Sequence, residues 1–480
     1  MLIGIDVGTT AVKAALFDFK GNALKTFSRR YPTLRPANGH VEQNPDDWMR
    51  LVLAALTELS DGPPAGNVTA IGLCSQVNTH VFVDAHGRPL LPAFTWQDGR
   101  CAEQAALLDA QISEDEKLGW WGAALPIDAS HVLSRMAYVA KHFPDIWHKT
   151  RWVMAPKDYC LLHLTGEAVT DPMTAFGIVD GNLKLLPPLL NLVPGATERL
   201  PALASFTKVT GPISDGLPCA GLPMVTGAMD AWSGLLGAGV SEEGQSLYLS
   251  GTSEILGIVS SRKKPVPGVI AFPKCEGILL HAGPTQSGGA SVEWVSKLLG
   301  RTPAEISELA ATADTSKPVP MFLPHLEGER APLWDINSRA SLSGLSSNMG
   351  AAEVARATLE GVGYSSRLVM ESLVASACLC PKEINHSGGG ATSDTWCQIR
   401  ADILGLPIKR MRMLDAGVLG AALIAGTGAK VFESLSEAAK KFVTVDRVFV
   451  PNPEQQERHD HGFERYKMLY QQLKPWIASA

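Results

Sequence analysis

"MLIGIDVGTTAVKAALFD", residues 1–18, holds two apolar runs with an aspartate and a Gly-Thr-Thr turn between them. Each run has the length and composition of a buried strand. A carboxylate at the end of a buried strand is costly unless another group compensates its charge. The stretch therefore predicts a strand–turn–strand unit, and it raises the question of what compensates Asp6.

The segments that follow indicate an α/β protein. Apolar runs such as "VTAIGLCSQ" (68–76) alternate with helical patterns such as "NPDDWMRLVLAALTELS" (44–60). In the latter, Asn44 is a candidate N-cap and Pro45 the first helical residue. The chain has 480 residues, which exceeds the size at which a single core stops growing, so we expect two domains of similar weight.

The composition excludes several classes of protein. The net charge of −6 offers no basic field for nucleic acid or an anionic membrane. No apolar run reaches the roughly 18 residues that span a bilayer, and the first residues lack the basic region and cleavage site of a signal peptide. The eight cysteines fit neither a zinc site nor a disulfide framework. We therefore expect buried free thiols and a cytoplasmic location.

A weak internal repeat supports the two-domain expectation. "GTTAVKAAL" (8–16) and "GTSEILGIV" (251–259) each follow an apolar segment, and they lie about 240 residues apart, close to half the chain. The repeat suggests two related domains that each begin with a strand–turn–strand. Chance similarity between two short apolar segments is the alternative.

The two turns are candidate phosphate sites. Glycine lets the backbone approach a ligand, successive amides form an anion cradle, and Thr or Ser adds a hydroxyl donor. A carboxylate beside such a site, here Asp6, is repulsive unless a cation lies between, which indicates Mg²⁺ bound through water. Ordinary hairpin turns, a strand-end Asp6 that caps its own turn, and a Lys13 that only snorkels are the alternatives.

Two further features concern chemistry. Residues 388–390 are three glycines between a short strand candidate and a helical pattern, an order that lets a nucleotide lie on the backbone. Asp230 follows an apolar strand and a Gly turn at the start of a small-residue helix, where capping and the helix dipole alone would favour it. His459-Asp460-His461 could suggest a metal site, but a solvated helix face explains these residues better.

Five motifs in order carry a resemblance to the FGGY carbohydrate kinases of the actin/hexokinase superfamily. The family's first phosphate motif is similar to "GIDVGTTAVKAALFD" (4–18), its second to "LSGTSE" (249–254), and its adenosine motif to "GGGATSDTWCQIRADILGLPI" (388–408). Its GER-x-P segment is similar to "LPHLEGERAPLWD" (323–335), and its C-terminal signature fits the spacing of "ASLSGLSSNMGAAEVARATLE" (340–360).

The resemblance implies two ribonuclease-H-like α/β domains with a catalytic cleft between them. Residues 1–240 would carry the sugar site and the first phosphate motif, and residues 241–480 would bind the nucleotide. ATP and Mg²⁺ are the implied cofactors. Asp6 would then lie where its strand opens on the cleft, and a metal-bound phosphate would offset its charge.

The resemblance also assigns roles. Asp230 would be the base that accepts the hydroxyl proton, and Asp6 would position Mg²⁺ through water. The implied ATP-binding residues are Gly8, Thr9, Thr10, Lys13, Gly251, Thr252, Ser253, Gly289, Glu293, Gly389, Gly390 and Asp394. Glu293 could instead be a helix-surface acid, and Asp394 an N-cap.

Residues 70–100 and "EQNPDDWM" (42–49) are most similar to the xylulokinases of the family. This implies phosphorylation of a primary hydroxyl of a ketopentose such as D-xylulose, giving the 5-phosphate. The sugar-site candidates are Gln76, Val77, Asn78, Trp96, Asp98, Arg100 and Asp230, of which Trp96, Asp98 and Arg100 could instead pack loops. Xylulokinases typically carry Gln-Met-His where this chain has Gln76-Val77-Asn78, so ribulose, a tetrulose or an erythritol-like polyol stays an alternative.

Two hypotheses that assign the protein to other functional classes stay open. One is a non-kinase ATPase switch of the same superfamily, which shares the phosphate turns but does not need Asp230 in its "GAMDA" context. The other is a sugar-binding regulator that has lost catalysis, against which the presence of both Asp6 and Asp230 argues. The expected partners are a small sugar and ATP, without nucleic acid or membrane, and a homodimer is an open alternative for the assembly.

Overall fold

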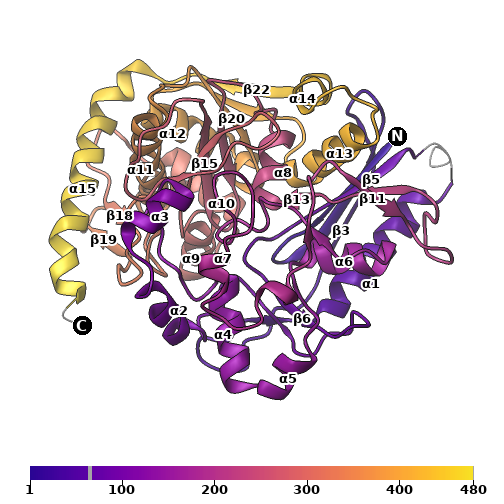
Figure 1. The fold of residues 1–480 in the computed structure, drawn as a ribbon. Coiled ribbons are helices and arrows are strands. Elements are labelled where there is room, and N and C mark those ends of the chain that lie inside the picture. Colours follow the sequence, from indigo (N-terminus) through magenta and orange to yellow (C-terminus); the bar gives the residue numbers. More distant parts are fainter. Residues whose placement is uncertain (63–67, 479–480) are drawn as a thin grey trace. The chain divides into compact units, whose positions relative to one another are not determined.

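The computed structural model describes residues 1–62 and 68–478, which form two compact units. Unit 1 comprises Met1–Gly239 and Asp415–Val443, and unit 2 comprises Val240–Leu414 and the chain from Thr444 onward. The division expected at residue 240 differs from this in one respect, because Asp415–Val443 belongs to unit 1. Figure 1 shows the reason, since α13 (Ala416–Gly428), drawn in orange, lies beside the indigo strands of unit 1.

The central sheet of unit 1 is mixed. Its middle strand β1 (Leu2–Val7) pairs antiparallel with β2 (Ala11–Phe17) and parallel with β5 (Ala70–Ser75). The two-residue strand β13 (Ala228–Met229) also pairs parallel with β5. The full order is β11-β12-β5-β1-β2-β3, where the remaining strands are β3 (Ala23–Arg30), β11 (Val209–Pro212) and β12 (Pro223–Val225).

The two faces of this sheet are covered differently. Ile3, Ile5 and Val7 join the core that includes helix α1 (Pro45–Ser60). On the other face, a Cβ added to Gly4 would lie 1.9 Å from the carbonyl oxygen of Val418, so α13 packs directly on the strand backbone. Asp6 alternates with Ile5 and Val7 and therefore lies on the α13 face.

Unit 1 contains further short elements. Three two-stranded pairs are β4 (Glu42–Gln43) with β7 (Ala93–Phe94), β6 (Val81–Val83) with β8 (Trp152–Met154), and β9 (Val169–Thr170) with β10 (Ala202–Leu203). The other helices are α2 (Ala102–Asp109), α3 (Glu114–Trp121), α4 (Val132–His142), α5 (Pro144–Lys149), α6 (Pro156–Thr165), α7 (Pro187–Leu190), α8 (Asp230–Gly237) and α14 (Leu435–Phe442).

Unit 2 is built on a second mixed sheet. Its order is β16-β17-β15-β14-β20-β21-β22, with β14 (Ser246–Ser250) antiparallel to β15 (Glu254–Val259) and parallel to β20 (Ile384–Ser387). The remaining elements are β16 (Ile270–Ala271), β17 (Leu280–Pro284), β18 (Met321–Leu323), β19 (Ser341–Ser343), β21 (Ile408–Met411), β22 (Val445–Phe449), α9 (Gly289–Leu299), α10 (Pro303–Thr312), α11 (Ala351–Ala377), α12 (Asp394–Leu404) and α15 (Gln456–Ala478).

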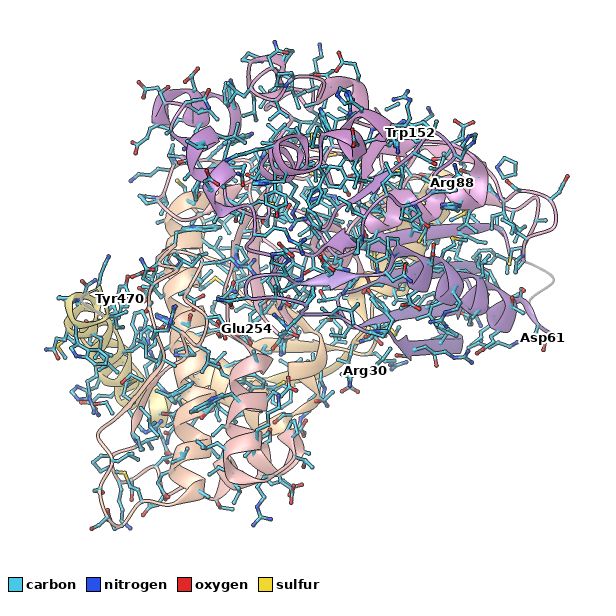
Figure 2. All side chains as sticks on the ribbon, turned by 90° about the horizontal axis from the view of Figure 1, so that it is seen from below. Arg30, Asp61, Arg88, Trp152, Glu254 and Tyr470 are labelled. Carbon is cyan, nitrogen blue, oxygen red and sulfur yellow. The ribbon has the colours of Figure 1, made fainter. Side chains whose placement is uncertain are left out.

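The two sheets repeat one pattern. From β3 through β2, β1, β5 and β12 to β11, the pairings run antiparallel, antiparallel, parallel, parallel, antiparallel. The series from β17 through β15, β14, β20 and β21 to β22 has the same pairings. The internal repeat is therefore confirmed, and each Gly-Thr-Thr/Ser turn joins the two antiparallel strands at the same position of its sheet. In Figure 2, which draws the side chains, Arg30 marks the edge strand β3 of the first sheet, and Glu254 begins β15 of the second.

Two expectations from the sequence need correction. All eight cysteines are free, as expected, but Cys378 and Cys380 are exposed and Cys219 is only partly buried. His459 is fully buried and its Nδ1 lies 3.1 Å from the hydroxyl of Tyr364, so it belongs to the packing of α15 and not to a solvated face. Within the described residues, no helix is both long enough and apolar enough to cross a membrane.

Candidate active site

The carboxyl ends of three parallel strands meet at one edge of the sheet in unit 1. In the register of the sheet, Asp6 of β1 and Ala228 of β13 both pair with Cys74, on opposite sides of β5. Neighbouring strands lie about 5 Å apart. The residues that end these strands or follow them, Asp6, Gln76 and Asp230, are thus gathered at the same edge.

One oxygen of the Asp6 carboxylate is unsatisfied. Its Oδ1 is buried and has no hydrogen-bond partner among the described residues. Burial raises the pKa of Asp6 to about 6, although a hydrogen bond with Cys74 and the charge of Lys13 act in the opposite direction. A Cβ added to Gly417, in the first turn of α13, would lie 3.2 Å from Oδ2, so the carboxylate faces the amino end of this helix. A helix amino terminus favours negative charge there.

Lys13 pairs with a residue that the sequence did not single out. Its Nζ lies 2.5 Å from Oδ1 of Asp415, the N-cap of α13, and both side chains are about half exposed. Lys13 stands directly opposite Asp6 in the pairing of β1 with β2. The lysine therefore lies beside the candidate phosphate turn and is held there by an exposed ion pair, which is a weak interaction.

The turn at Gly8–Thr10 is fixed by side chains from outside the hairpin. Tyr31 donates a hydrogen bond from its hydroxyl to the Gly8 carbonyl. The indole Nε1 of Trp96 donates to Thr9 Oγ1 over 3.0 Å, which leaves the hydroxyl hydrogen of Thr9 available to a ligand. Trp96, predicted near the sugar, thus has a defined contact with the first phosphate turn.

Asp230 opens α8, as the sequence predicted. Its Oδ1 accepts a 2.7 Å hydrogen bond from the Ala231 amide, and the residue is partly exposed. Burial raises the pKa of the Cys74 thiol, and the charges of Asp6 and Asp230 raise it further. One thiol therefore senses both carboxylates, which supports their proximity at the sheet edge.

Three of the predicted sugar-site residues, Gln76, Val77 and Asn78, are adjacent in the chain. Gln76 is buried, donates a 2.8 Å hydrogen bond to Oε1 of Gln43, and keeps its own Oε1 without a partner among the described residues. Asn78 has φ of 53°, a conformation that asparagine tolerates well, and donates to the hydroxyl of Ser130 over 3.2 Å. Val77, between them, is partly buried.

Asn78 also lines a cavity of about 40 Å³ within unit 1. His131, Asp158, Thr170 and Thr174 line it together with apolar residues such as Phe176. A cavity of this size has room for a small number of water molecules or a hydroxymethyl group. The cavity thus lies where the sequence departs from the Gln-Met-His pattern.

Asp98 and Arg100 have structural partners. The Asp98 carboxylate accepts from the Val41 amide over 2.6 Å and from Arg100 Nη2 over 2.7 Å. Arg100 also pairs with Glu42 over 2.7 Å and stacks on Phe94. These contacts fit the loop-packing alternative, and a sugar contact for either residue stays a prediction.

In unit 2, the Gly251–Ser253 turn is bonded to the start of α9. The Thr252 carbonyl accepts from the amides of Gly288 and Ala290, each over 3.0 Å. A Cβ added to Gly289 would lie 2.6 Å from the carbonyl oxygen of Gly251. Glycine is thus required at 289 for this close approach, which places the residue at the turn as the sequence suggested.

The remaining nucleotide candidates lie around α12 and α9. A Cβ on Gly389 would meet no atom within 4 Å, whereas one on Gly390 would lie 2.2 Å from Ser250 Oγ. Asp394 follows the N-cap Ser393 and pairs with Arg410 over 2.6 Å and with Arg447. Glu293 is exposed and lies 3.5 Å from Lys297, which fits a helix-surface acid. Contacts of these residues with a nucleotide stay predictions.

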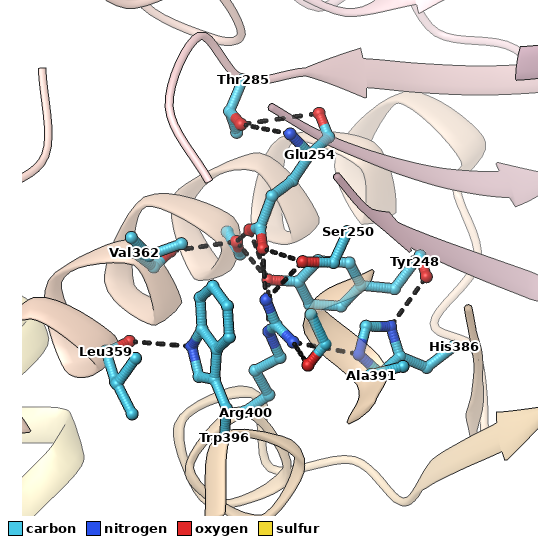
Figure 3. A network of polar contacts seen from close by, with 12 residues as sticks. Tyr248, Ser250, Glu254, Thr285, Leu359, Val362, His386, Ala391, Trp396 and Arg400 are labelled. Carbon is cyan, nitrogen blue, oxygen red and sulfur yellow. Dashed lines mark hydrogen bonds and ion pairs between the residues drawn. The ribbon is translucent and has the colours of Figure 1, made fainter. Parts of the chain in front are cut away.

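Sequence reasoning missed two buried carboxylates of unit 2. Glu254 and Arg400 form an ion pair in which both side chains are fully buried, at the centre of the polar network in Figure 3. Glu329 accepts from the amides of Gln286 and Arg330, and burial raises its pKa to about 7. Both residues lie within motifs that carried the family resemblance, Glu254 in "LSGTSE" and Glu329 in "LEGER", and a charged residue inside such a motif was the available signal.

The donor set at the sheet edge of unit 1 fits a hydrated divalent cation. Among the described residues, no cluster of three or more His, Cys, Asp or Glu side chains could hold a metal ion by itself. Mg²⁺ commonly uses one or two carboxylates and completes its shell with water and substrate phosphates. The orphaned Oδ1 of Asp6 is a suitable ligand of this kind.

The comparisons with known proteins agree with the resemblance to the FGGY carbohydrate kinases. Residues 1–237 match the N-terminal domain of the FGGY family of carbohydrate kinases, and residues 247–429 match its C-terminal domain. The chain is 30% identical to the xylulose kinase of Escherichia coli (strain K12) over 499 residues, with all of both chains covered. The ligand-bound xylulose kinase of Lactobacillus acidophilus has a TM-score of 0.90 at 27% identity and 99% coverage of both chains.

A gluconate kinase structure from Lactobacillus acidophilus is nearly as similar. It has a TM-score of 0.88 at 27% identity, and the match covers 98% of this chain and 97% of that one. The likeness to these structures confirms the expected two-domain α/β fold. The proteins differ in the acceptor that their names state, so the comparisons leave the acceptor open.

Proposed function

The chain belongs to the FGGY family of carbohydrate kinases, and we propose from this premise that it phosphorylates a ketopentose. The family implies ATP as the phosphoryl donor. The proposed acceptor is D-xylulose, with transfer to a primary hydroxyl that gives the 5-phosphate. The name of the Escherichia coli relative, which matches over the full length of both chains, supports this acceptor.

One observation carries the catalytic part of the proposal. Asp6, near the end of β1, and Asp230, directly after β13, belong to two parallel strands on opposite sides of β5 and lie at one sheet edge. Asp230 starts a helix, and a helix amino terminus favours the ionised carboxylate. We assign it the role of general base, which accepts the proton of the sugar hydroxyl as the hydroxyl oxygen attacks the γ-phosphorus and the bond to the departing ADP breaks.

Asp6 is assigned to the metal. The carboxylate would hold Mg²⁺ through water, because its Oδ1 is buried without a partner among the described residues and would gain a favourable interaction there. When bound, Mg²⁺ supplies neutralisation of the phosphate charge. The turn amides, with the hydroxyls of Thr9, Thr10 and Thr252, are assigned to the phosphate oxygens.

An acceptor other than D-xylulose is the alternative within the family. The Gln76-Val77-Asn78 sequence departs from the Gln-Met-His of xylulokinases, and Asn78 lines the 40 Å³ cavity. The similar gluconate kinase structure supports a sugar acid as the alternative acceptor. Within the family, the acceptor is thus the finer question.

A screen with ATP tests both levels of the proposal. The purified protein is offered D-xylulose, D-ribulose, erythritol, glycerol and gluconate, and ADP formation is measured. We expect the highest kcat/KM with D-xylulose. A higher value with another compound would replace the acceptor and leave the kinase assignment intact, whereas equal ADP release without any acceptor would favour an ATPase switch.

A further inference from the structure

The Glu254–Arg400 ion pair joins two segments that sequence similarity assigns separately to ATP. Glu254 directly follows the Gly251–Ser253 turn, and Arg400 comes from α12, 146 residues later. Both side chains are fully buried. Figure 3 shows the guanidinium at the centre of the network, between the strand that precedes the turn and the backbone beside Ala391.

The two terminal nitrogens of Arg400 divide between these segments. Nη2 donates to Ser250 Oγ over 2.6 Å and to Glu254 Oε1, on the two sides of the turn. Nη1 donates to the Gly390 carbonyl over 3.1 Å. One planar fork therefore fixes the distance between the phosphate turn and the glycine segment at 388–390, and a lysine ammonium has no such fork.

The glycine segment packs on the same serine. A Cβ added to Gly388 would lie 2.4 Å from the Ser250 carbonyl oxygen, and one on Gly390 would lie 2.2 Å from Ser250 Oγ. The glycines thus permit close contact with β14 as well as with a ligand. Ser250 precedes the turn immediately, so any shift of the glycine segment would be transmitted to the turn.

The remaining contacts hold the pair in one orientation. Glu254 Oε2 accepts from the hydroxyls of Tyr248 over 2.5 Å and Ser366 over 2.6 Å. Burial lowers the pKa of His386 well below its usual value, so the ring is neutral. Its Nδ1 lies 2.8 Å from the Tyr248 carbonyl oxygen and its Nε2 lies 3.0 Å from Arg400 Nη1, a geometry in which Nε2 accepts from the arginine. The Tyr248 and Ser366 hydroxyls also lie 2.7 Å apart, and the network therefore surrounds both members of the pair with polar contacts.

Stability alone does not account for such a pair. A buried ion pair loses hydration at both charges, and replacement by apolar residues of similar volume is often neutral or stabilising. What the pair adds is a fixed geometry. We propose that Glu254 and Arg400 are positioning residues that set the spacing of the phosphate turn and the glycine segment, and so determine the affinity for the nucleoside triphosphate.

The inference rests on the proposed nucleotide role of these segments, and ATP binding without sugar tests it. The double variant Glu254→Gln/Arg400→Met removes both charges, keeps an acceptor for Tyr248 and Ser366, and deletes the link to Gly390. We expect it to fold and to bind ATP about tenfold more weakly in calorimetric titration, the equivalent of one or two lost hydrogen bonds. KM for the sugar should stay within about twofold, since the sugar contacts are assigned to unit 1.

Two further variants keep the test decisive. Arg400→Lys retains the charge but not the fork, and it should also weaken ATP binding. Glu360→Gln is the matched control, because Glu360 is another buried carboxylate of unit 2, paired with Arg356 over 2.6 Å and Arg458 over 2.7 Å. It should lower the melting temperature and leave ATP binding unchanged.

The possible results separate a failure of this inference from a failure of the proposed function. Wild-type affinity for ATP in either Arg400 variant would overturn the inference. Equal weakening by Glu360→Gln would also overturn it, because the effect would then be general loosening of unit 2. If the wild-type protein itself bound no ATP, the proposed function would fail, which is a different result.

Discussion

The turns at Gly8–Thr10 and Gly251–Ser253 occupy the same position in two sheets that share one pattern of strand pairing. The carboxylates beside these turns differ, because one has an oxygen without a partner in the described part of the chain and the other is fully hydrogen-bonded. Asp6, before the first turn, has a buried oxygen without a partner among the described residues, and its pKa is raised to about 6. Glu254, after the second turn, accepts from Arg400 and from three hydroxyls. One copy of the motif thus keeps an unsatisfied charge, and the other compensates its charge fully.

The two copies of the turn are thus suited to different roles. Local rules of polar satisfaction are broken mainly at functional sites, where a ligand supplies the missing partner. On this argument the first turn belongs to the chemistry and the second to the positioning of the nucleotide. Variants of the two turns test that division.

Asp230→Asn should have the largest effect, because the first unit would lose its general base. We expect kcat to fall about 10²–10⁴-fold while the affinities for sugar and ATP change little. Steady-state kinetics and nucleotide titration measure the two quantities. Asp145→Asn is the matched control, since Asp145 is likewise an acid in the first turn of a helix and should leave kcat unchanged. Near-normal turnover of Asp230→Asn would remove this residue from the mechanism.

Asp6→Asn and Glu254→Gln should change stability in opposite directions. The Asp6 carboxyl has an unfolded pKa near 3.8 and a folded pKa of about 6, so the folded state binds more protons between these values. Its ionisation therefore destabilises the ligand-free fold progressively as pH rises from about 4 to 6, by about 3 kcal/mol at most. Asp6→Asn should raise the melting temperature at pH 7.5, lose that gain near pH 4, and impair turnover.

Glu254→Gln provides the contrast. It leaves Arg400 buried without its counter-charge, and breaking a buried pair in this way costs about 3–5 kcal/mol. Melting curves of both variants from pH 4 to 8 measure the comparison. Two variants that shift stability in the same direction at pH 7.5 would show that the two turns do not differ as described.

Helix and strand positions could be predicted from adjacent residues, whereas contacts between distant segments could not be predicted from the sequence. Asn44 caps α1 through the Asp46 amide and Pro45 begins the helix, as the sequence indicated, because capping depends on a few adjacent residues. The return of Asp415–Val443 to unit 1 depends on the close approach of α13 to Gly4, a contact between distant segments. No local pattern reports such a contact.

The same distinction between local patterns and distant contacts applies to the candidate site. Asp6 and Asp230 could be found because each lies at or directly after the end of a strand and near a glycine turn. The Glu254–Arg400 pair could not, because its members are 146 residues apart and neither motif shows which distant residue it contacts. For Asp98 and Arg100 the residue types were compatible with sugar binding, and only the structure shows that Val41, Glu42 and Phe94 are their partners.

Gly390→Ala should have an intermediate effect on the second turn. The added methyl would lie 2.2 Å from Ser250 Oγ, so the glycine segment has to move away from the turn. We expect ATP binding to weaken about three- to tenfold, which corresponds to the loss of about one hydrogen bond. Gly300→Ala is an informative control for added bulk in unit 2, since its Cβ would meet nothing within 4 Å, although its positive φ brings a small strain of its own. Equal affinity in wild type and Gly390→Ala would show that this packing does not set the nucleotide site.

Asn78→His should have the smallest effect, and it concerns the acceptor alone. Histidine tolerates the positive φ of this position about as well as asparagine does, and its larger ring would extend toward the cavity that Asn78 lines. An imidazole and a carboxamide differ in reach and in donor pattern, and a polar site rejects a substrate that leaves its groups unpaired. If Asn78 contacts the sugar, the variant should raise kcat/KM for D-xylulose severalfold relative to the best other acceptor in the screen.

The ratio between two acceptors separates this role from loop support. Asn78 also donates to Ser130, so its replacement can disturb the loop and lower activity with every substrate equally. Ser130→Ala removes the same hydrogen bond and leaves residue 78 intact, and it should lower both kcat/KM values without changing their ratio. A ratio that stays constant in Asn78→His as well would mean that Asn78 supports the loop only. The acceptor would then be selected by other groups at the sheet edge, with Gln76 and its unpartnered Oε1 as the next residue to test.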